Sequence, residues 1–496
     1  MDQNIERRTN QYPPVRRRRK KIPKWKRMLR KYWPPIRFSL LIIAFISLIV
    51  FGVDTIVDGI RLASANKPVK ETTVETTTEV TLSQEEILLL ADELLAEADK
   101  MAVGYNYRGA ISILQNFEYY NSEASFASKF DSKIKELQQL DSTLVSYPNM
   151  NRITHVFFHS LIVDPSRAFD GEYTQKGYNQ YMTTCDEFVA MLEEMYNRGY
   201  VLVTPYDVAY EVSDAYGTRF TYGDIRLPEG KTPFILSQDD LNYYGYMIGG
   251  ESGVNEKPIF ANTKGDGFAH RIVIGEDGYP TCEYMDKEGN VTTGDYDIVP
   301  LLEKFIQEHP DFAYHGARAV LGMTGYEGVF GYRTKPSYEA ALGTERFQAE
   351  IAAAKEVAQC LRDHGWILAS HSYGHPAYGN IPDENVAIDS DKWEATVESI
   401  IGETDIILYP HGSDIAGPEE YTFENAKFAA LYEDGYRYFF NVDSKVAWCQ
   451  LGSNYFRGGR RNLDGYRMWY SPDGLSDLFD VEKVFDDARP TPVPSI

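Results

Sequence analysis

Two short strings, Ser237-Gln238-Asp239-Asp240 and His371-Ser372-Tyr373-Gly374-His375, contain residue types that could form a metal site. Each string directly follows a short apolar run, at residues 232–236 and 366–369, that reads as a buried strand. If both strands belong to one parallel sheet, one carboxylate and two imidazoles could meet at its rim as a three-ligand metal site with open positions. The second carboxylate would then be free to act as a base.

The spacing within each string supports this interpretation. Successive strand residues point to opposite faces, but a strand end that turns into a loop can bring both Asp239 and Asp240 inward. His371 and His375 are four residues apart, which puts both on one side of a helical turn. A solvated turn is the plain alternative for the acidic pair, and ordinary loop histidines are the alternative for the other string. The occurrence of both strings together favours the metal site.

A second histidine pair with the same spacing, His155 and His159, lies in an apolar segment that is predicted to be a strand. At strand spacing the two side chains share one face. His155 lies well before the end of the strand, and we interpret it as structural. His159 is either a packed core residue or a pocket residue.

The charge of the chain is divided sharply. Residues 1–37 have 14 Lys and Arg against Asp2 and Glu6, a formal charge of +12, so the remainder has −35 of the total of −23. Such an acidic body argues against binding to nucleic acid or to an anionic membrane surface. A length of 496 residues with 43% apolar residues predicts two or more domains and a large packed core.

An apolar run follows the basic segment and predicts a membrane anchor. Residues 38–53 contain no charge, and Ile56, Val57 and the long side chain of Arg37 extend the run to a transmembrane helix over residues 38–58. The Lys and Arg excess places residues 1–37 in the cytoplasm as a basic tail, so the rest would lie outside a single-pass plasma-membrane protein. A cleaved signal peptide ending at Ala63-Ser64-Ala65 is the alternative.

Two segments separate this helix from the main domain. Residues 59–82 are rich in threonine and predict a linker. Residues 83–148 have helical periodicity and predict a small bundle or a single tetratricopeptide-like hairpin. Because one repeat cannot build a peptide-binding groove, a spacer is favoured over a peptide-binding role.

Strand and helix patterns alternate from residue 150 to residue 475, which implies a parallel sheet. Six or seven such units close more naturally into a barrel than into an open sheet. Residues 242–297 break the rhythm with turn signals at Glu276-Asp277-Gly278 and Lys287-Glu288-Gly289-Asn290, which suggests an inserted hairpin region. Residues 324–341 resemble a loop over the site, and residues 476–496 are expected to be a C-terminal tail.

The strings resemble those of the polysaccharide deacetylase family, the NodB-homology carbohydrate esterases. That family has a Thr-Phe-Asp-Asp-Gly string, a His-Ser/Thr-x-x-His string and a Tyr-Pro-x-Gly or Arg-x-Pro-Tyr-Gly string, in that order. Here the third appears as Tyr409-Pro410-His411-Gly412, and Phe157-Phe158-His159-Ser160 is similar to the Tyr-His string that begins many members. The resemblance covers about residues 150–475. It implies an α/β fold, a distorted (β/α)7 barrel, preceded here by the transmembrane helix and the small α-helical segment.

The resemblance also implies roles. Asp239 would be the base, and Asp240, His371 and His375 would hold a divalent cation, Zn²⁺ first, with Co²⁺, Ni²⁺ or Mn²⁺ as alternatives. The cation would polarise an acetyl carbonyl while Asp239 takes a proton from the attacking water. The backbone N–H of His411 would bind the developing oxyanion.

The chain departs from the family pattern at two functional positions. The usual acid is a histidine in a late Leu-x-His string, but no histidine follows His411. The arginine that normally orients the base corresponds to Leu408. Arg460 or Arg461 could supply the lost charge, and His159 or His411 could donate the proton.

Aromatic residues of the predicted loops could stack on sugar rings. The candidates are Tyr243, Tyr244, Tyr246, Tyr326, Tyr332 and Trp448, of which Tyr243 and Tyr244 directly follow the acidic pair. The family resemblance adds Tyr409, Pro410 and Gly412 as substrate-binding positions.

Together these features predict a membrane-anchored extracellular deacetylase that removes N-acetyl groups from a cell-envelope glycan, such as peptidoglycan or another GlcNAc polymer. The expected partner is therefore an extracellular glycan, with no nucleic acid. A non-catalytic glycan-binding protein on a degenerate barrel is the first alternative. The second is a structural or partner-binding envelope protein in which residues 83–145 are the working part.

Overall fold

The computed structural model describes residues 82–496 except residues 122–123, 216 and 445–446. The predicted cytoplasmic tail, the membrane helix and nearly all of the threonine-rich linker lie outside the described residues. Among the residues that are described, no helix is both long and apolar enough to cross a membrane.

Three helices come first in the described chain: α2 (Gln84–Val103), α3 (Tyr107–Gln115) and α4 (Ala124–Thr143). They pack around a small core of their own that includes Ala98, Leu114 and Leu137. Helix α2 begins with a capping box: Ser83 Oγ accepts a hydrogen bond from the Glu86 N–H, and the Glu86 carboxylate accepts one from the Ser83 N–H at 2.7 Å.

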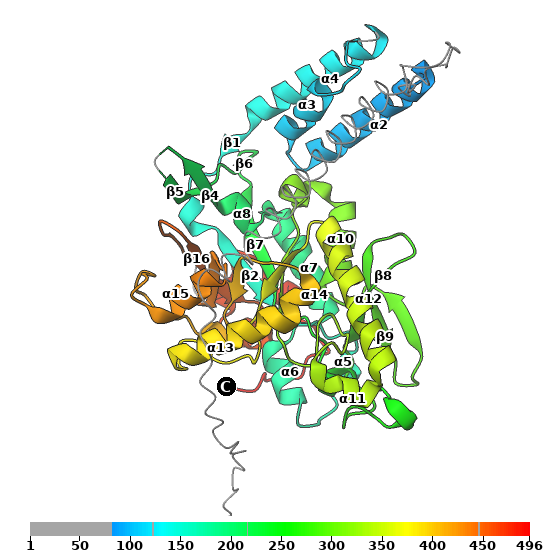
Figure 1. The fold of residues 1–496 in the computed structure, drawn as a ribbon, viewed down its shortest axis with the longest axis vertical. Coiled ribbons are helices and arrows are strands. Elements are labelled where there is room, and N and C mark those ends of the chain that lie inside the picture. The colour runs from blue at the N-terminus through cyan, green and yellow to red at the C-terminus, as the bar shows by residue number, and fades with distance from the viewer. Residues whose placement is uncertain (1–81, 122–123, 216, 445–446) are drawn as a thin grey trace, which may run out of the picture. The chain divides into compact units, whose positions relative to one another are not determined.

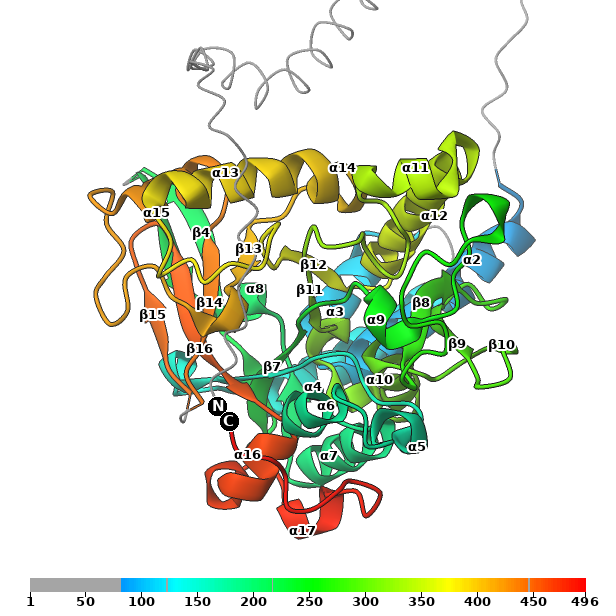
Figure 2. The same ribbon diagram turned by 90° about the horizontal axis from the view of Figure 1, so that it is seen from below.

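Seven parallel strands close into a barrel in the main part of the chain. In ring order they are β2 (Thr154–Phe158), β7 (Thr232–Gln238), β11 (Val320–Met323), β12 (Ile367–Ser370), β13 (Ile406–Leu408), β14 (Tyr438–Val442) and β16 (Phe456–Asn462), which returns to β2. Parallel neighbours need a crossover between them. Helices supply most of these, whereas β14 and β16 are connected through the short strand β15 (Cys449–Leu451). The fold is therefore α/β with a closed seven-stranded parallel barrel, in agreement with the predicted fold class (Figure 2).

The remaining strands lie beside the ring. Strand β3 (Tyr200–Leu202) pairs with the first half of β7, and β11 pairs with its second half. Strand β15 (Cys449–Leu451) pairs antiparallel with β16. Two further antiparallel pairs are β1 (Val145–Ser146) with β6 (Arg226–Leu227) and β4 (Ala209–Asp214) with β5 (Gly217–Tyr222).

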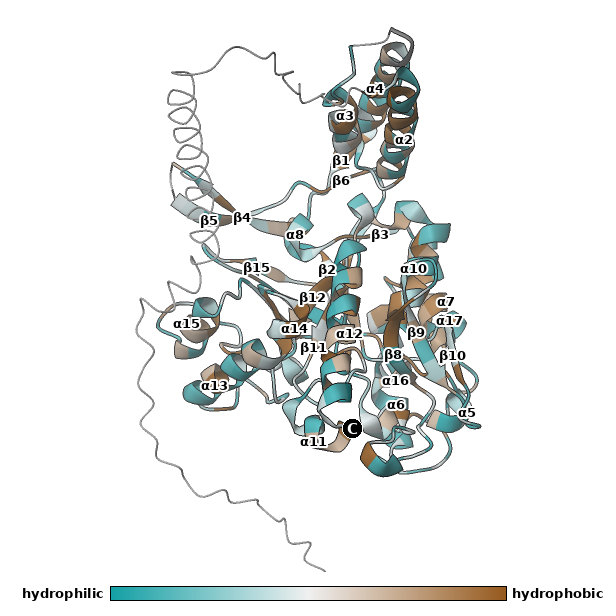
Figure 3. Cartoon of the chain, turned by 45° about the vertical axis from the view of Figure 1, so that its right-hand side comes forward, coloured by the Kyte–Doolittle hydropathy of each residue, from teal (hydrophilic) through white to brown (hydrophobic). Residues whose placement is uncertain are grey.

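Helices surround the barrel (Figures 1 and 2). The longer ones are α7 (Cys185–Asn197), α10 (Ile298–Glu308), α12 (Thr344–Asp363), α13 (Asp383–Trp393) and α15 (Ala426–Glu433). The shorter ones are α5 (Pro165–Ala168), α6 (Gln175–Tyr181), α8 (Pro205–Val208), α9 (Gly245–Ile248), α11 (Glu339–Leu342), α14 (Ser399–Ile401), α16 (Gly465–Tyr470) and α17 (Val481–Val484). Figure 3 shows hydrophobic residues gathered along the strands and many hydrophilic residues along helices such as α12.

Successive residues of each barrel strand face alternately into and out of the barrel. Ile235, Val320 and Leu408 belong to one buried cluster that fills the inside. Leu236 and Leu321 face outward and belong to the cluster beneath the helices. Toward the carboxyl ends of the strands, polar side chains replace the apolar ones in the inward rows. The alternation therefore directs those polar side chains to one rim of the barrel.

Residues 242–297 contain a sheet of three antiparallel strands, β8 (Ala269–Ile274), β9 (Pro280–Met285) and β10 (Val291–Gly294). The turns between these strands fall at residues 275–279 and 286–290, where the sequence has its turn signals. Arg333, which is fully buried in the loop after β11, contacts Glu251 at 3.3 Å and Glu327 at 3.4 Å. The pair with Glu251 fastens the inserted region to the loop after β11, and the pair with Glu327 lies within that loop.

Two segments differ from expectation. No strand is predicted at residues 456–462, yet β16 closes the barrel there; its Phe-Arg-Gly-Gly-Arg-Arg-Asn sequence lacks the apolar run of a buried strand. The expected C-terminal tail packs against the domain instead. Arg489 and Glu187 form an ion pair in which both side chains are 0% exposed, and Val493 is buried as well. These contacts hold the last residues of the chain against α7.

Candidate metal and catalytic site

Three of the predicted site residues meet at the carboxyl rim of the barrel. Asp240 follows β7, and His371 and His375 follow β12; one ligand atom from each of the three lies within 4.8 Å of the others. The Nε2 atoms of the two histidines are 3.2 Å apart, and His375 Nε2 is 3.8 Å from Asp240 Oδ2. His371 is buried, whereas Asp240 and His375 are partly exposed, so the group lies between the barrel interior and solvent.

Left-handed backbone conformations at the rim turn these side chains toward one another. The φ angles are +59° at Asp240, +65° at Ser372 and +51° at His375, a region that costs non-glycine residues roughly 1–3 kcal/mol each. The turn at Asp240 ends the strand alternation that would otherwise send Asp239 and Asp240 to opposite faces. Both acidic residues therefore reach the same site, as the sequence predicts for a strand end that becomes a loop.

The partners of the three residues fix their orientation. His371 donates from Nδ1 to the carbonyl of Leu408 at 2.8 Å, so its Nε2 lone pair faces the site. Tyr244 donates its hydroxyl to Asp240 Oδ1 at 2.6 Å, which leaves Oδ2 on the side of the histidines. Two imidazoles bound to a tetrahedral Zn²⁺ through bonds of about 2.05 Å have nitrogens roughly 3.3 Å apart. The observed separation of 3.2 Å fits a divalent cation held by these residues.

Asp239 lies beside this group as a buried, paired carboxylate. It is 3% exposed and accepts two hydrogen bonds from the Arg460 guanidinium, at 2.6 and 2.9 Å. Burial alone raises the pKa of the Asp239 carboxyl, but the charges of Arg460 and His371 outweigh it and hold the pKa well below its ordinary value. Asp239 is therefore ionised at neutral pH, and its Oδ2 lies 3.8 Å from His371 Nε2.

Position 408, where the family has an arginine beside the base, is a leucine in this chain. Arg460 supplies the positive charge beside Asp239 instead, and Arg461 does not. The two are successive residues of β16, so their side chains leave opposite faces of the strand. Arg461 pairs with Asp477 at 2.8 Å, away from the metal group. Arg460 also donates to Ser237 Oγ at 3.2 Å, and that hydroxyl lies 2.9 Å from His155 Nε2 inside the barrel.

The burial of His155 predicts a stability that falls in mild acid. Burial, helped by the charge of Arg460, holds the pKa of its imidazole well below the ordinary value of 6.5. Below that pH the unfolded chain takes up a proton that the folded chain does not, so the free energy of unfolding decreases by up to about 1.4 kcal/mol per pH unit. His155→Gln should flatten this slope in denaturant titrations between pH 6.5 and 5. Equal slopes in the two proteins would contradict the assignment.

Two histidines remain as candidates for the general acid. The ring centroid of His411 lies 4.4 Å from that of His375, and burial, together with the charge of His375, lowers the pKa of His411. His159 is half-buried at the end of β2, where its charge acts on Asp239 and on Asp464. The charge of His159 also acts on His375, so His159 lies close to both the candidate base and a candidate ligand, and we take it as the candidate acid.

Of the predicted aromatic contacts, Tyr244 lies at the site, whereas Tyr243 and Tyr409 face the core. Tyr243 is 1% exposed and donates its hydroxyl to Asp297 at 2.6 Å. Tyr409 is 0% exposed and accepts a hydrogen bond from the Tyr421 hydroxyl at 3.2 Å. Neither ring is available to a sugar in this structure, because both side chains are buried and both hydroxyls are hydrogen-bonded inside the protein.

The other predicted substrate positions shape the rim. Pro410 is buried. Gly412 has a φ of +62°, and a Cβ there would lie 2.4 Å from Val442 Cβ, so the close approach of the loop to β14 requires glycine. Trp448 lines a small cavity together with His155 and does not belong to the metal group.

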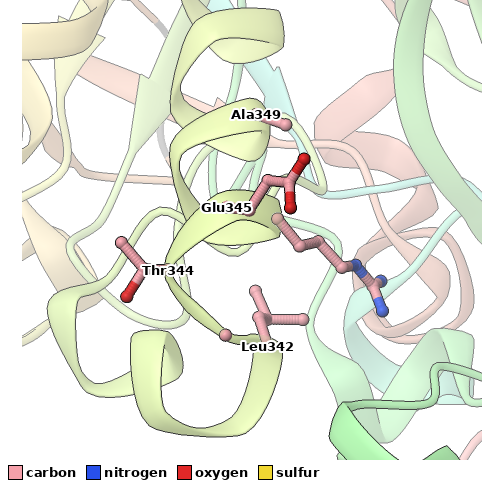
Figure 4. A pocket seen from close by; sticks show the side chains of 6 residues that line it. Leu342, Thr344, Glu345 and Ala349 are labelled. Atoms are coloured by element: carbon pink, nitrogen blue, oxygen red, sulfur yellow. The ribbon is translucent and has the colours of Figure 1, made fainter.

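A surface pocket of about 510 Å³ lies at the start of α12 (Figure 4). It is lined by Leu342, Gly343, Thr344, Glu345, Arg346 and Ala349. None of these residues is a candidate ligand, base or acid. The candidate site is therefore the group of residues at the barrel rim and not this pocket.

Comparisons with known proteins give one structural likeness. No protein-family model matches the sequence, and no curated protein matches it either. The structure of Streptococcus pyogenes deacetylase PplD in complex with acetate is similar over 66% of this chain and 98% of that chain, at 14% identity and a TM-score of 0.35. This similarity is too low to assign the roles of that protein's residues to residues of this chain. The roles of Asp239, Asp240, His371 and His375 are therefore inferred from contacts within this chain.

Proposed function

We propose that this protein is a metal-dependent hydrolase that removes N-acetyl groups from a GlcNAc-containing glycan of the cell envelope. One observation supports this most: Asp240, His371 and His375 gather beside Asp239, a buried carboxylate that Arg460 keeps ionised. Three ligands with a separate base beside them are a set of groups that can perform metal-assisted hydrolysis.

The roles follow from the chemistry of each group. A divalent cation held by Asp240, His371 and His375 would supply Lewis acidity toward a carbonyl oxygen and a water molecule. Asp239 accepts a proton from the attacking water, and the two hydrogen bonds from Arg460 keep the acceptor oxygens in place. The backbone N–H of His411 stabilises the charge that develops on the carbonyl oxygen.

His159 donates the proton that the leaving amine needs. Its neighbour Asp464 is 4% exposed, and burial raises the pKa of that carboxyl. The carboxyl of Asp464 lies close enough to His159 for their charges to interact, so Asp464 can help to position the imidazole. The acid thus comes from the end of β2 instead of a late histidine string.

The location of the reaction is also a proposal. Residues 38–58 anchor the chain in the plasma membrane with residues 1–37 in the cytoplasm, which is supported by the uncharged run at 38–53 and the +12 charge before it. The barrel then lies on the extracellular side, beside a glycan substrate.

Acetate release tests the function. The purified full chain, loaded with Zn²⁺, is expected to release acetate from N-acetylated chitotetraose and from p-nitrophenyl acetate. Chitotetraose binding without acetate release from either compound would favour a glycan-binding protein on a deacetylase-like barrel. Neither binding nor release would contradict a glycan function altogether.

A further inference from the structure

Three tyrosines form an aromatic surface next to the metal group, which we call the tyrosine shelf: Tyr244, Tyr246 and Tyr326. The rings of Tyr244 and Tyr246 are stacked, with centroids 5.8 Å apart and an interplanar angle of 10°. Tyr326 stands edge-on to Tyr244, at 6.3 Å and 90°. Tyr246 is 49% exposed and Tyr326 is 50% exposed, so two of the three rings are half open to solvent.

The shelf begins at a candidate metal ligand. The Tyr244 hydroxyl donates to Asp240 Oδ1 at 2.6 Å and lies 2.9 Å from Thr324 Oγ1. Tyr246 and Tyr326 each contact the ring of Tyr244, and Tyr244 in turn is hydrogen-bonded to Asp240. A ligand on the shelf would extend directly from the reaction centre.

Buried contacts hold the shelf rigid although its rings are exposed. The Asn242 side chain joins the loop after β7 to the loop after β11, with Nδ2 donating to the Thr324 carbonyl at 2.9 Å. Glu327 accepts from the Gly245 N–H at 2.6 Å and from Arg333 at 3.4 Å. Exposed aromatic rings on a rigid support lose little conformational entropy when they bind a ligand, which is a property of binding surfaces.

The exposed rings suit a sugar. The ring of Tyr244 lies parallel to and offset from that of Tyr246, and Lys335 Nζ lies 5.1 Å from the centroid of Tyr326. About half of the surface of Tyr246 and of Tyr326 remains exposed to a ligand. A pyranose ring presents apolar C–H groups on its faces and hydroxyls at its edge, and tyrosine matches both with its ring and its hydroxyl.

The charges around the shelf indicate which glycans fit. Asp240, Glu327 and Asp266 all act on the Tyr246 hydroxyl, and burial together with these carboxylates raises the pKa of that group. A bound cation would neutralise Asp240, and Lys335 lies beside Tyr326, but Glu327 and Asp266 keep negative charge beside Tyr246. That side of the shelf is expected to repel a polyanionic glycan and to accept a neutral chain or one with free amines.

We propose that the tyrosine shelf is a sugar-binding subsite that holds the pyranose next to the acetylated unit in a neutral or partly deacetylated glycan. This inference rests on the proposed function, because the shelf extends from the site at which the acetyl group would be cleaved. In this proposal, Tyr246 and Tyr326 make the protein prefer substrates that have more than one sugar unit.

Two substrates of different length test the subsite. Chitotetraose has neighbouring sugar rings and p-nitrophenyl acetate has none. Tyr246→Ala and Tyr326→Ala should each lower kcat/KM for chitotetraose about tenfold more than kcat/KM for p-nitrophenyl acetate. The loss should appear mainly as a higher KM for chitotetraose. Tyr246→Phe should restore most of the loss because it keeps the ring. Tyr173→Ala, at a tyrosine that is 97% exposed, provides a matched control and should change neither substrate.

Two results would overturn the subsite. The first is an equal loss for both substrates, and the second is no loss for chitotetraose. If the wild-type chain cleaves neither substrate, the proposed function fails separately, and calorimetric binding of chitotetraose then decides the inference. Binding that Tyr246→Ala weakens about tenfold supports the subsite, and an unchanged or undetectable affinity contradicts it.

Discussion

Asp239→Asn is expected to reduce acetate release by about 10²–10⁴-fold, because an amide cannot accept the proton that the attacking water must lose. Asparagine has nearly the same shape, and its oxygen can still accept one of the two hydrogen bonds from Arg460, but the buried guanidinium loses its counter-charge. The variant is therefore expected to be less stable, and its rate is compared at a temperature at which the unfolding curve shows it folded. The comparison requires initial rates with p-nitrophenyl acetate and chitotetraose at saturating Zn²⁺, together with an unfolding curve for each protein.

Asp477→Asn is the matched control for this variant. Asp477 also pairs with an arginine of β16, Arg461, but that pair lies away from the metal group. Its rate should stay close to that of the wild type. A rate for Asp239→Asn within about tenfold of the wild type would assign the base to another group.

Arg460→Met is expected to have the second largest effect, on both stability and rate. The Arg460 side chain is 0% exposed and its partner Asp239 is 4% exposed, so the substitution leaves a buried carboxylate without its counter-charge. Breaking a buried pair in this way costs about 3–5 kcal/mol of unfolding free energy. Any remaining folded protein should also lose activity, because Asp239 loses the two hydrogen bonds that position its oxygens and burial favours its protonated form, which cannot act as a base.

A double-mutant cycle separates the pair from other effects of the substitution. Adding Asp239→Asn to Arg460→Met removes the unpaired charge and should recover a large part of the lost stability. Arg461→Met offers the comparison within the same strand: its partner Asp477 is 48% exposed and can be solvated when left alone. A loss for Arg460→Met no greater than that for Arg461→Met would contradict the buried pairing.

The metal group could be predicted because its residues directly follow recognisable strands. Strand β7 ends at Gln238 and β12 ends at Ser370, so Asp239 and His371 are the first residues after two strands that contain apolar runs. In a parallel barrel all such positions lie at one rim. The sequence therefore contained enough information to bring these distant residues together.

Arg460 could be named from the sequence only as one of two candidates. The strand that presents it has no apolar run, and its three arginines are buried because each meets a carboxylate distant in the chain. Those pairings depend on the closed barrel and leave no local pattern. Alternation within the strand separates Arg460 from Arg461 only once the strand itself is known.

The substrate contacts were the least predictable part of the site. A tyrosine has an apolar ring and a polar end, so it serves equally in a core and on a surface. Tyr243 is buried because the Asp297 carboxylate from the inserted region accepts its hydroxyl, and nothing near Tyr243 in the sequence indicates that partner. Tyr246, three residues later, is half exposed.

The zinc content of the chain shows whether Asp240, His371 and His375 hold a cation. It is measured by elemental analysis after incubation with Zn²⁺ and removal of excess metal. The expected result is about one zinc per chain in the wild type and in Asp239→Asn, and less than about a tenth of that in His371→Ala. Equal zinc in the wild type and His371→Ala, or no bound zinc in the wild type, would contradict it.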